Sequence, residues 1–172
     1  LNEMRRRHDP LRTTFHLIGE QPVQVIAPAQ DVTLPIVDLA EIPSSNREAE
    51  VLRLAAKGER PFDLARDPLF RATLVRVSAE EHVLLLTAHH IIFDGWSTGV
   101  LYRELGTLYN AFLSGEESPL PELPIQYADF ACWERQWLQG GGLEAQLAYW
   151  KPQLANMPVL RLPTDRPRPP VQ

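Results

Sequence analysis

HVLLLTAHHIIFDGWS (82–97) begins with the longest apolar stretch of the chain, which continues past two histidines to residue 93. A run of aliphatic residues without polar alternation is typical of a strand that is buried on both faces. We therefore predict a central β-strand over 82–92. The residues that follow, 96–115, repeat apolar side chains at spacings of three and four and end at Gly115, which predicts a long amphipathic helix.

The upstream residues predict strands and one helix. Residues 11–20 and 22–28 are rich in β-branched residues and are separated by a glycine-containing turn, which predicts a hairpin. Pro35 favours an edge position for the strand around it. Ser45 and Glu48 have the spacing of a capping box at the start of a helix. The expected single strands and helix cover 32–40, 46–60 and 69–78.

Two further helices are expected downstream, after a proline-rich connector at 117–124. They cover 126–138 and 143–154, and three glycines separate them. The mixture of hairpin, buried strand and helices predicts an α/β fold, an α+β layered sandwich in which helices flank a mixed sheet.

Composition excludes several classes of function. The 172 residues carry a net charge of −5, so we expect no nucleic-acid partner. No apolar run reaches the roughly 18 residues that cross a bilayer, so we expect no membrane association. The single cysteine, Cys132, excludes an internal disulfide and a cysteine-rich metal site, and we interpret it as a small packed residue. These properties fit a cytoplasmic protein.

The segment AHHIIFDGWS (88–97) contains the residues most suited to chemistry. Side chains alternate along a strand, so only one of His89 and His90 can face a given cavity. Imidazole accepts a proton near neutral pH, and the N–H groups that open the next helix could stabilise an oxyanion. A buried Asp94 would need a cationic partner. A structural histidine pair is the alternative, and a metal site of His89, His90 and Asp94 is opposed by the strand geometry.

Three motifs carry a resemblance to a known family. AHHIIFDGWS resembles the H-H-x-x-x-D-G signature of the chloramphenicol acetyltransferase-like superfamily. RHDPLRTTF (7–15) and YADFACWERQWL (127–138) resemble two motifs of the condensation domains of non-ribosomal peptide synthetases. The resemblance covers essentially the whole chain. It implies one lobe of the acetyltransferase-like fold, with a mixed sheet flanked by helices.

The resemblance also implies a domain organisation. Residues 1–163 correspond to the amino-terminal lobe of a condensation domain without its first motif and its carboxy-terminal lobe. Residues 164–172 correspond to a proline-rich crossover segment. The sequence starts like the last turns of a helix and ends in this segment, so we expect an excerpt of a longer chain that is inactive alone.

Residue roles follow from the resemblance. The catalytic histidine is His90, and His89 is structural. Asp94 is expected to form a structural salt bridge with Arg12, or alternatively with Arg7. The remaining residues are the glycine of a narrow turn, two residues near the substrate or carrier arm, and packing or positioning residues: Gly95, Trp96, Ser97, Tyr127, Asp129, Trp133, Trp137 and Trp150. No metal is expected.

The implied reaction is aminolysis of a thioester that forms a peptide bond. Its substrates are carried on the phosphopantetheine arms of donor and acceptor peptidyl carrier domains, with an adenylation domain in the same assembly line. No cofactor is bound directly. His90 would take a proton from the amine, position it, or stabilise the tetrahedral intermediate. The alternatives are an epimerisation domain of the same superfamily and a non-catalytic lobe that docks carrier proteins. A glycerolipid acyltransferase, suggested by the H-x-x-x-x-D spacing, lacks supporting features here.

Overall fold

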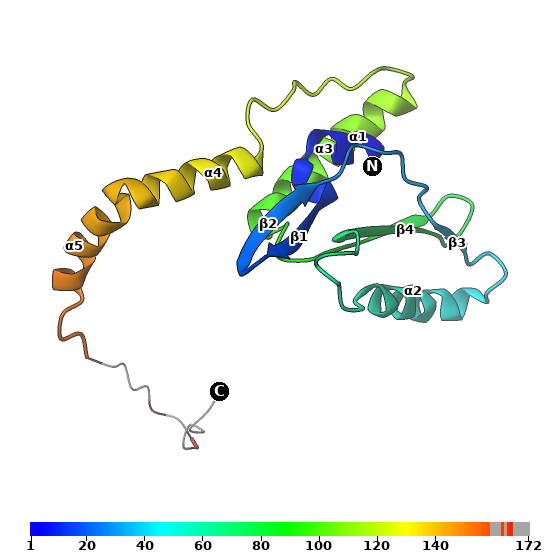
Figure 1. Ribbon diagram of the computed structural model, residues 1–172. Coiled ribbons are helices and arrows are strands. Elements are labelled where there is room, and N and C mark those ends of the chain that lie inside the picture. Colours follow the sequence, from blue (N-terminus) through cyan, green and yellow to red (C-terminus); the bar gives the residue numbers. More distant parts are fainter. Residues whose placement is uncertain (159–162, 164, 167–172) are drawn as a thin grey trace. The chain divides into compact units, whose positions relative to one another are not determined.

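Strand β4 (Phe70–Arg76) is the middle strand of a three-stranded sheet in the computed structural model, which describes residues 1–158, 163, 165 and 166 (Figure 1). β3 (Ile36–Asp38) pairs with it in parallel and β5 (His82–Ala88) pairs antiparallel. The edge position expected near Pro35 is confirmed for β3. The central position expected for residues 82–92 is wrong among the described strands, because β5 pairs only with β4 and ends at Ala88.

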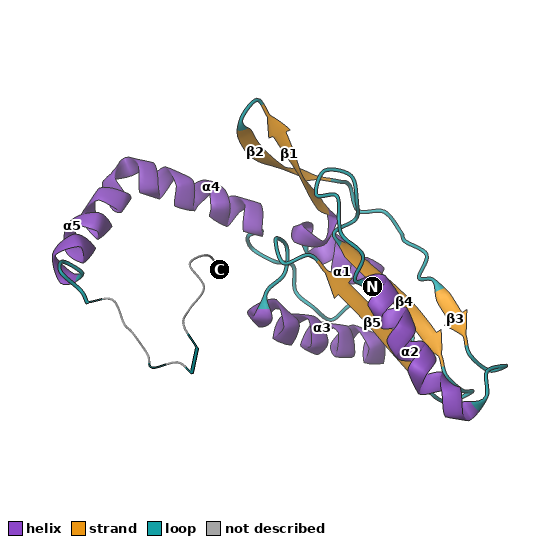
Figure 2. Ribbon diagram, turned by 90° about the horizontal axis from the view of Figure 1, so that it is seen from below, coloured by secondary structure: helices purple, strands orange, loops and turns teal. Residues whose placement is uncertain are grey.

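Helices cover both faces of this sheet, so the expected layered α/β fold is confirmed. Figure 1 shows α2 (Ser44–Gly58) below the sheet, and α1 (Asn2–Arg7) and α3 (Gly95–Leu113) above it. In the view of Figure 2 the three layers follow one another in the same order.

The core lies between the sheet and the helices α1 and α3. Phe70 of β4 stands opposite Ala88 of β5 and faces this layer, because paired residues share a face. The buried cluster consists of Met4, Leu11, Phe70, Leu101 and Leu108. On the other face α2 comes close to β5, where a Cβ atom at Gly58 would lie 3.1 Å from Thr87 Oγ1.

The start of α2 differs from the expectation. The helix begins at Ser44, and its first turn has no side-chain cap, so the capping box predicted from Ser45 and Glu48 is wrong. Instead, Ser45 Oγ hydrogen-bonds to Asn46 Oδ1. The helix turns Val51, Leu54 and Ala55 away from solvent.

The predicted hairpin is confirmed as strands β1 (Thr13–Ile18) and β2 (Gln21–Ile26), which form a separate antiparallel pair. Gly19 in the turn has a φ of 64°, a conformation that glycine adopts without steric cost. A short 3₁₀ helix, Asp9–Arg12, joins α1 to β1. The hairpin therefore follows directly from the helix that carries Arg7.

The chain divides into two compact units, Leu1–Phe130 and Ala131–Gln172, and the second contains most of α4 (Tyr127–Trp137) and all of α5 (Leu143–Gln153). A kink at Leu138–Gly142, with φ of 95° at Gly141, separates the two helices as predicted.

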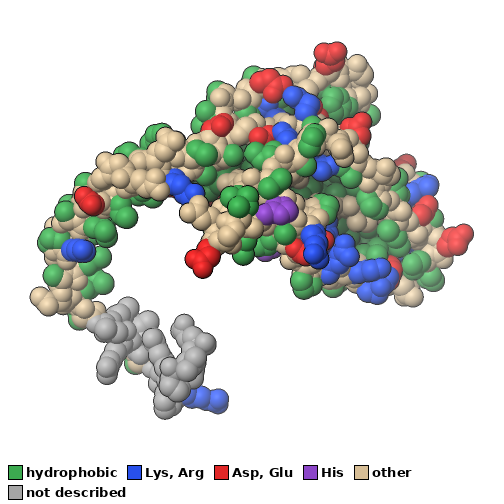
Figure 3. All heavy atoms as spheres, viewed as in Figure 1, with side chains coloured by type: hydrophobic (Ala, Val, Ile, Leu, Met, Phe, Trp, Pro, Cys, Tyr) green, Lys and Arg blue, Asp and Glu red, His purple; other side chains and the backbone are tan. Residues whose placement is uncertain are grey.

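Many apolar side chains of these two helices are exposed, as Figure 3 shows. Trp137, Trp150 and Cys132 are among the exposed residues, so the packed positions expected for them are wrong in this chain. Among the described residues no helix is both long and apolar enough to cross a membrane. The crossover expected at 164–172 lies outside the described residues, apart from Asp165 and Arg166.

Candidate functional site

The amino terminus of α3 is closed by a reciprocal capping box. Asp94 Oδ1 accepts hydrogen bonds from the backbone N–H of Ser97 at 2.8 Å and from its hydroxyl at 2.6 Å. Ser97 Oγ accepts the backbone N–H of Asp94 at 3.3 Å. The local pair satisfies donors that a helix start leaves open, and it fixes the position of the turn that precedes the helix.

The same contacts set the charge of Asp94. The hydroxyl of Ser97, then its backbone N–H, and to a smaller extent the imidazole of His90 hold the pKa of this carboxyl below its ordinary value. Hydrogen bonds to the ionised form favour that form. Asp94 therefore presents a carboxylate beside His90.

The two histidines follow β5 in a turn and have different surroundings. His89 is partly buried, and its ring meets the edge of Phe62 with centroids 5.8 Å apart. Its backbone N–H continues the strand ladder to Leu69 O at 2.9 Å. His90 is exposed and lines a cavity. The expectation that only one histidine faces this cavity agrees with these positions.

The cavity at His90 has a volume of about 190 Å³. Its lining also includes Asp94 and Ser97, so three of the residues expected from the sequence are brought together. The hairpin, the short 3₁₀ helix and α4 supply further walls that sequence reasoning did not assign to a cavity. These are Pro10, Thr13, Phe15, Gln24 and Tyr127.

A signal for the hairpin residues exists in the sequence. Thr13 and Phe15 alternate along β1 and share one face, and Phe15 stands opposite Gln24 in β2. The motif at 7–15 therefore supplies the wall of the cavity as well as its arginines. Tyr127 is half exposed to solvent, at 58 %, and forms part of the same lining.

A second cavity of about 270 Å³ adjoins the first, and Ser97 lines both. Its walls are mainly apolar and include Met4, Leu11 and Trp96. Trp96 is 85 % exposed, so it does not belong to the core. Both residues expected near a substrate therefore lie at these cavities.

Neither arginine pairs with Asp94, so the predicted salt bridge is wrong among the described residues. Arg12 forms an ion pair with Asp9, three residues earlier, and donates from Nε to Arg5 O at 3.2 Å. Arg7 instead pairs with Glu104 of α3 at 3.1 Å. The physical reason is local: Ser97 already occupies the Asp94 carboxylate, and Asp9 is the acid nearest in sequence to Arg12.

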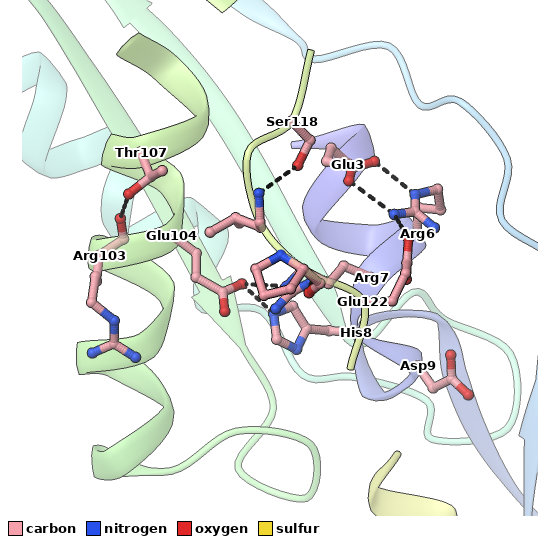
Figure 4. Close-up of polar contacts among 12 residues, drawn as sticks. Glu3, Arg6, Arg7, His8, Asp9, Arg103, Glu104, Thr107, Ser118 and Glu122 are labelled. Carbon is pink, nitrogen blue, oxygen red and sulfur yellow. Dashed lines mark hydrogen bonds and ion pairs between the residues drawn. The ribbon is translucent and has the colours of Figure 1, made fainter. Parts of the chain in front are cut away.

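Figure 4 shows the cluster that holds Arg7. Glu104 Oε2 lies 3.1 Å from Arg7 Nε and 2.6 Å from His8 Nε2. Burial raises the pKa of Glu104, but the hydrogen bonds and charges of His8 and Arg7 outweigh this, and the pKa lies below its ordinary value. Arg7 also donates to Pro121 O. The cluster therefore joins α1, α3 and the connector after α3.

Gly95 is the first residue of α3, and its φ is not positive. A Cβ atom at this position would meet no atom within 4 Å among the described residues. The tight backbone approach expected at this glycine is therefore not formed within this chain. Its place beside His90 follows from the sequence order alone.

This arrangement can bind a proton and hold a carboxylate beside a cavity. An imidazole at the rim of a cavity can accept a proton from a bound amine, and the adjacent carboxylate favours the imidazolium that results. Across the described residues, no three His, Cys, Asp or Glu side chains form a group suited to a metal ion.

Comparison with known proteins identifies relatives along the whole chain. The sequence profile of the Condensation domain family matches residues 1–172. One of the linear gramicidin synthase proteins of Brevibacillus parabrevis is 52 % identical over 168 residues, which are 96 % of this chain and 3 % of that protein. Chondramide synthase of Chondromyces crocatus is 47 % identical over 173 residues, covering 100 % of this chain and 4 % of that protein.

Solved structures agree with this. The X-domain from teicoplanin biosynthesis superposes with a TM-score of 0.79 at 36 % identity, covering 98 % of this chain and 37 % of that one. The epimerization domain from the third module of tyrocidine synthetase B gives 0.81 at 25 % identity, covering 95 % and 37 %. The chain thus spans little more than a third of these domains, and it belongs to the condensation domain family.

Proposed function

We propose that this chain forms the histidine-bearing lobe of a peptide-bond-forming condensation domain in a non-ribosomal peptide synthetase. The observation that carries the proposal is the cavity in which His90 lies beside the ionised Asp94, at the start of α3. The identity of about half of the residues to a linear gramicidin synthase protein supports the same reaction class.

The proposed reaction joins two carrier-bound groups. The amine nitrogen of the acceptor attacks the thioester carbonyl carbon of the donor, a C–N bond forms, and the C–S bond breaks. His90 takes the proton that the amine loses, and the departing thiolate is protonated to the free thiol. Asp94 favours the imidazolium form of His90 during this step.

The partners follow from this chemistry. Donor and acceptor carrier domains bring phosphopantetheine arms to the cavity, and an adenylation domain loads the acceptor. We place residues 1–163 in the amino-terminal lobe and expect a second lobe to complete the substrate channel. The chain alone would then be inactive, because much of the rate comes from holding both arms together. The proposed location is the cytoplasm.

Two other functions are favoured by specific comparisons. The tyrocidine epimerization domain has a similar fold, which makes α-carbon epimerisation the second candidate. The teicoplanin X-domain has been crystallised in complex with OxyB, which makes a docking role the third. A docking role does not require His90 beside a carboxylate, so we rank it below both enzymes.

The test uses the chain supplied with a second lobe, taken from the segment that follows the matching residues in the 52 % identical linear gramicidin synthase protein. Loaded donor and acceptor carriers are mixed with it and weighed by intact-protein mass spectrometry. Peptidyl mass should move to the acceptor with His90, and the His90→Ala variant should lose this transfer. The matched control is His82→Ala, an exposed histidine at the start of β5, which should transfer normally. Equal transfer by both variants would refute the role of His90.

A further inference from the structure

The turn that carries His90 is closed by the side chain of the preceding histidine. Ile91 N–H donates to His89 Nδ1 at 3.0 Å. Ile92 N–H donates to His89 O at 3.1 Å. Both bonds begin at His89 and pass over His90, so together they set the backbone that aims the His90 side chain.

The first of these bonds defines the chemical form of His89. A ring nitrogen that accepts a hydrogen bond carries no proton, so Nδ1 is unprotonated and the proton of the neutral ring lies on Nε2. The bond runs from a side chain to the backbone N–H two residues later. This is the geometry that Asn and Asp side chains form in an Asx turn.

The ring of His89 is held from the side by a second group of residues. Phe62, in the loop after α2, meets the ring at an interplanar angle of 89°. Arg71 of β4 covers the Phe62 ring, with Cζ 3.7 Å from its centroid. Arg71 also donates to Arg60 O at 2.8 Å and pairs with Asp67 at 3.0 Å, so the loop has little freedom to move.

We infer that His89 is a positioning residue for the reaction, whose Nδ1 acts as the acceptor of an Asx-like turn that orients His90. Phe62 and Arg71 hold its ring in the required orientation. The inference rests on the proposed function and deepens it, because it assigns the first histidine a hydrogen-bonding role that a specific substitution can restore. Asparagine places its Oδ1 near the position of Nδ1, whereas glutamine places its oxygen one bond further out.

The test compares His89→Asn, His89→Gln and His89→Ala in the two-lobed protein defined above. We expect His89→Asn to keep kcat within about threefold of wild type, because the Asx turn replaces the bond. The Gln and Ala variants should lose kcat by more than about tenfold with KM little changed, because His90 is misaligned after substrate has bound. Similar thermal unfolding of the Asn and Gln variants excludes a loss by misfolding. Equal kcat for Asn and Gln, or a greater loss with Asn, would overturn the inference.

A second measurement separates this inference from the proposed function. Amide hydrogen exchange at Ile91 is followed in the 172-residue chain, without substrates. The N–H should be protected in the wild type and in His89→Asn, and should exchange faster in His89→Gln. Loss of condensation by the wild type with this pattern intact would refute the function and leave the turn. An unprotected Ile91 N–H in the wild type would refute the turn itself.

Discussion

Replacing Glu104 with leucine tests how strongly the cluster of Arg7, His8 and Glu104 holds α3 against α1. The Arg7 side chain is 5 % exposed and the Glu104 side chain 10 %. Glu104 Oε2 contacts both Arg7 Nε and His8 Nε2. Removal of the carboxylate leaves the guanidinium charge buried without its partner, and breaking such a pair costs about 3–5 kcal/mol.

The expected effect can be read as a melting temperature. For a chain of this length, about 4 kcal/mol corresponds to a fall of about 8–16 °C in the Tm. The Tm of the 172-residue chain is measured by circular dichroism for wild type, Arg7→Met, Glu104→Leu and the double variant. Replacement of both partners by apolar residues should recover about 2–3 kcal/mol of the summed losses, because no unpaired charge remains.

The matched control is an exposed pair. Arg53 and Glu50 form an ion pair in α2 with the arginine side chain 62 % exposed. Glu50→Gln should leave the Tm nearly unchanged, because solvent screens such pairs. A Glu104→Leu loss no larger than that of the control, or strictly additive single losses at Arg7 and Glu104, would refute the reasoning.

Two further predictions concern the same helix. Asp94→Ala should raise amide exchange at Ser97 by about five- to tenfold, whereas Asp94→Asn, which keeps an acceptor, should change it less; equal exchange in the two variants would contradict the capping role. Acid should weaken the fold in a defined direction: the folded pKa of Glu104 lies below its unfolded value, so its contribution is present above the unfolded pKa and is lost as the pH falls through the folded pKa. Urea titrations below about pH 5 should therefore show a steeper loss in the wild type than in Glu104→Leu, and parallel curves would contradict this.

Local features of the fold were predictable from the sequence. The hairpin follows from its β-branched residues and Gly19, and the kink between α4 and α5 follows from its glycines. The helix α3 follows from its apolar spacing and ends before Gly115, which has a φ of 74°. These features depend on residues that are close in sequence, where steric and hydrogen-bonding preferences act directly.

Pairings between distant residues were not predictable. Arg7 and Glu104 are 97 residues apart, and no local pattern marks Glu104 as its partner. The apolar run of β5 indicates burial but not strand order, and the strand lies at an edge of the described sheet. The cavity at His90 was predictable in part: the motif at 88–97 indicates His90, Asp94 and Ser97, while the walls contributed by the hairpin require the fold.

The reaction class is tested most directly by one measurement of mass in deuterated water. The two-lobed protein receives a donor carrier loaded with an aminoacyl group and an acceptor carrier loaded with an amino acid, and both carriers are weighed after one turnover. The account predicts that the acceptor gains the mass of the donor acyl group while the donor returns to its free thiol. A gain of one deuterium on the donor without transfer would identify epimerisation instead. No change on either carrier, with both shown to be loaded, would contradict an enzymatic role for His90.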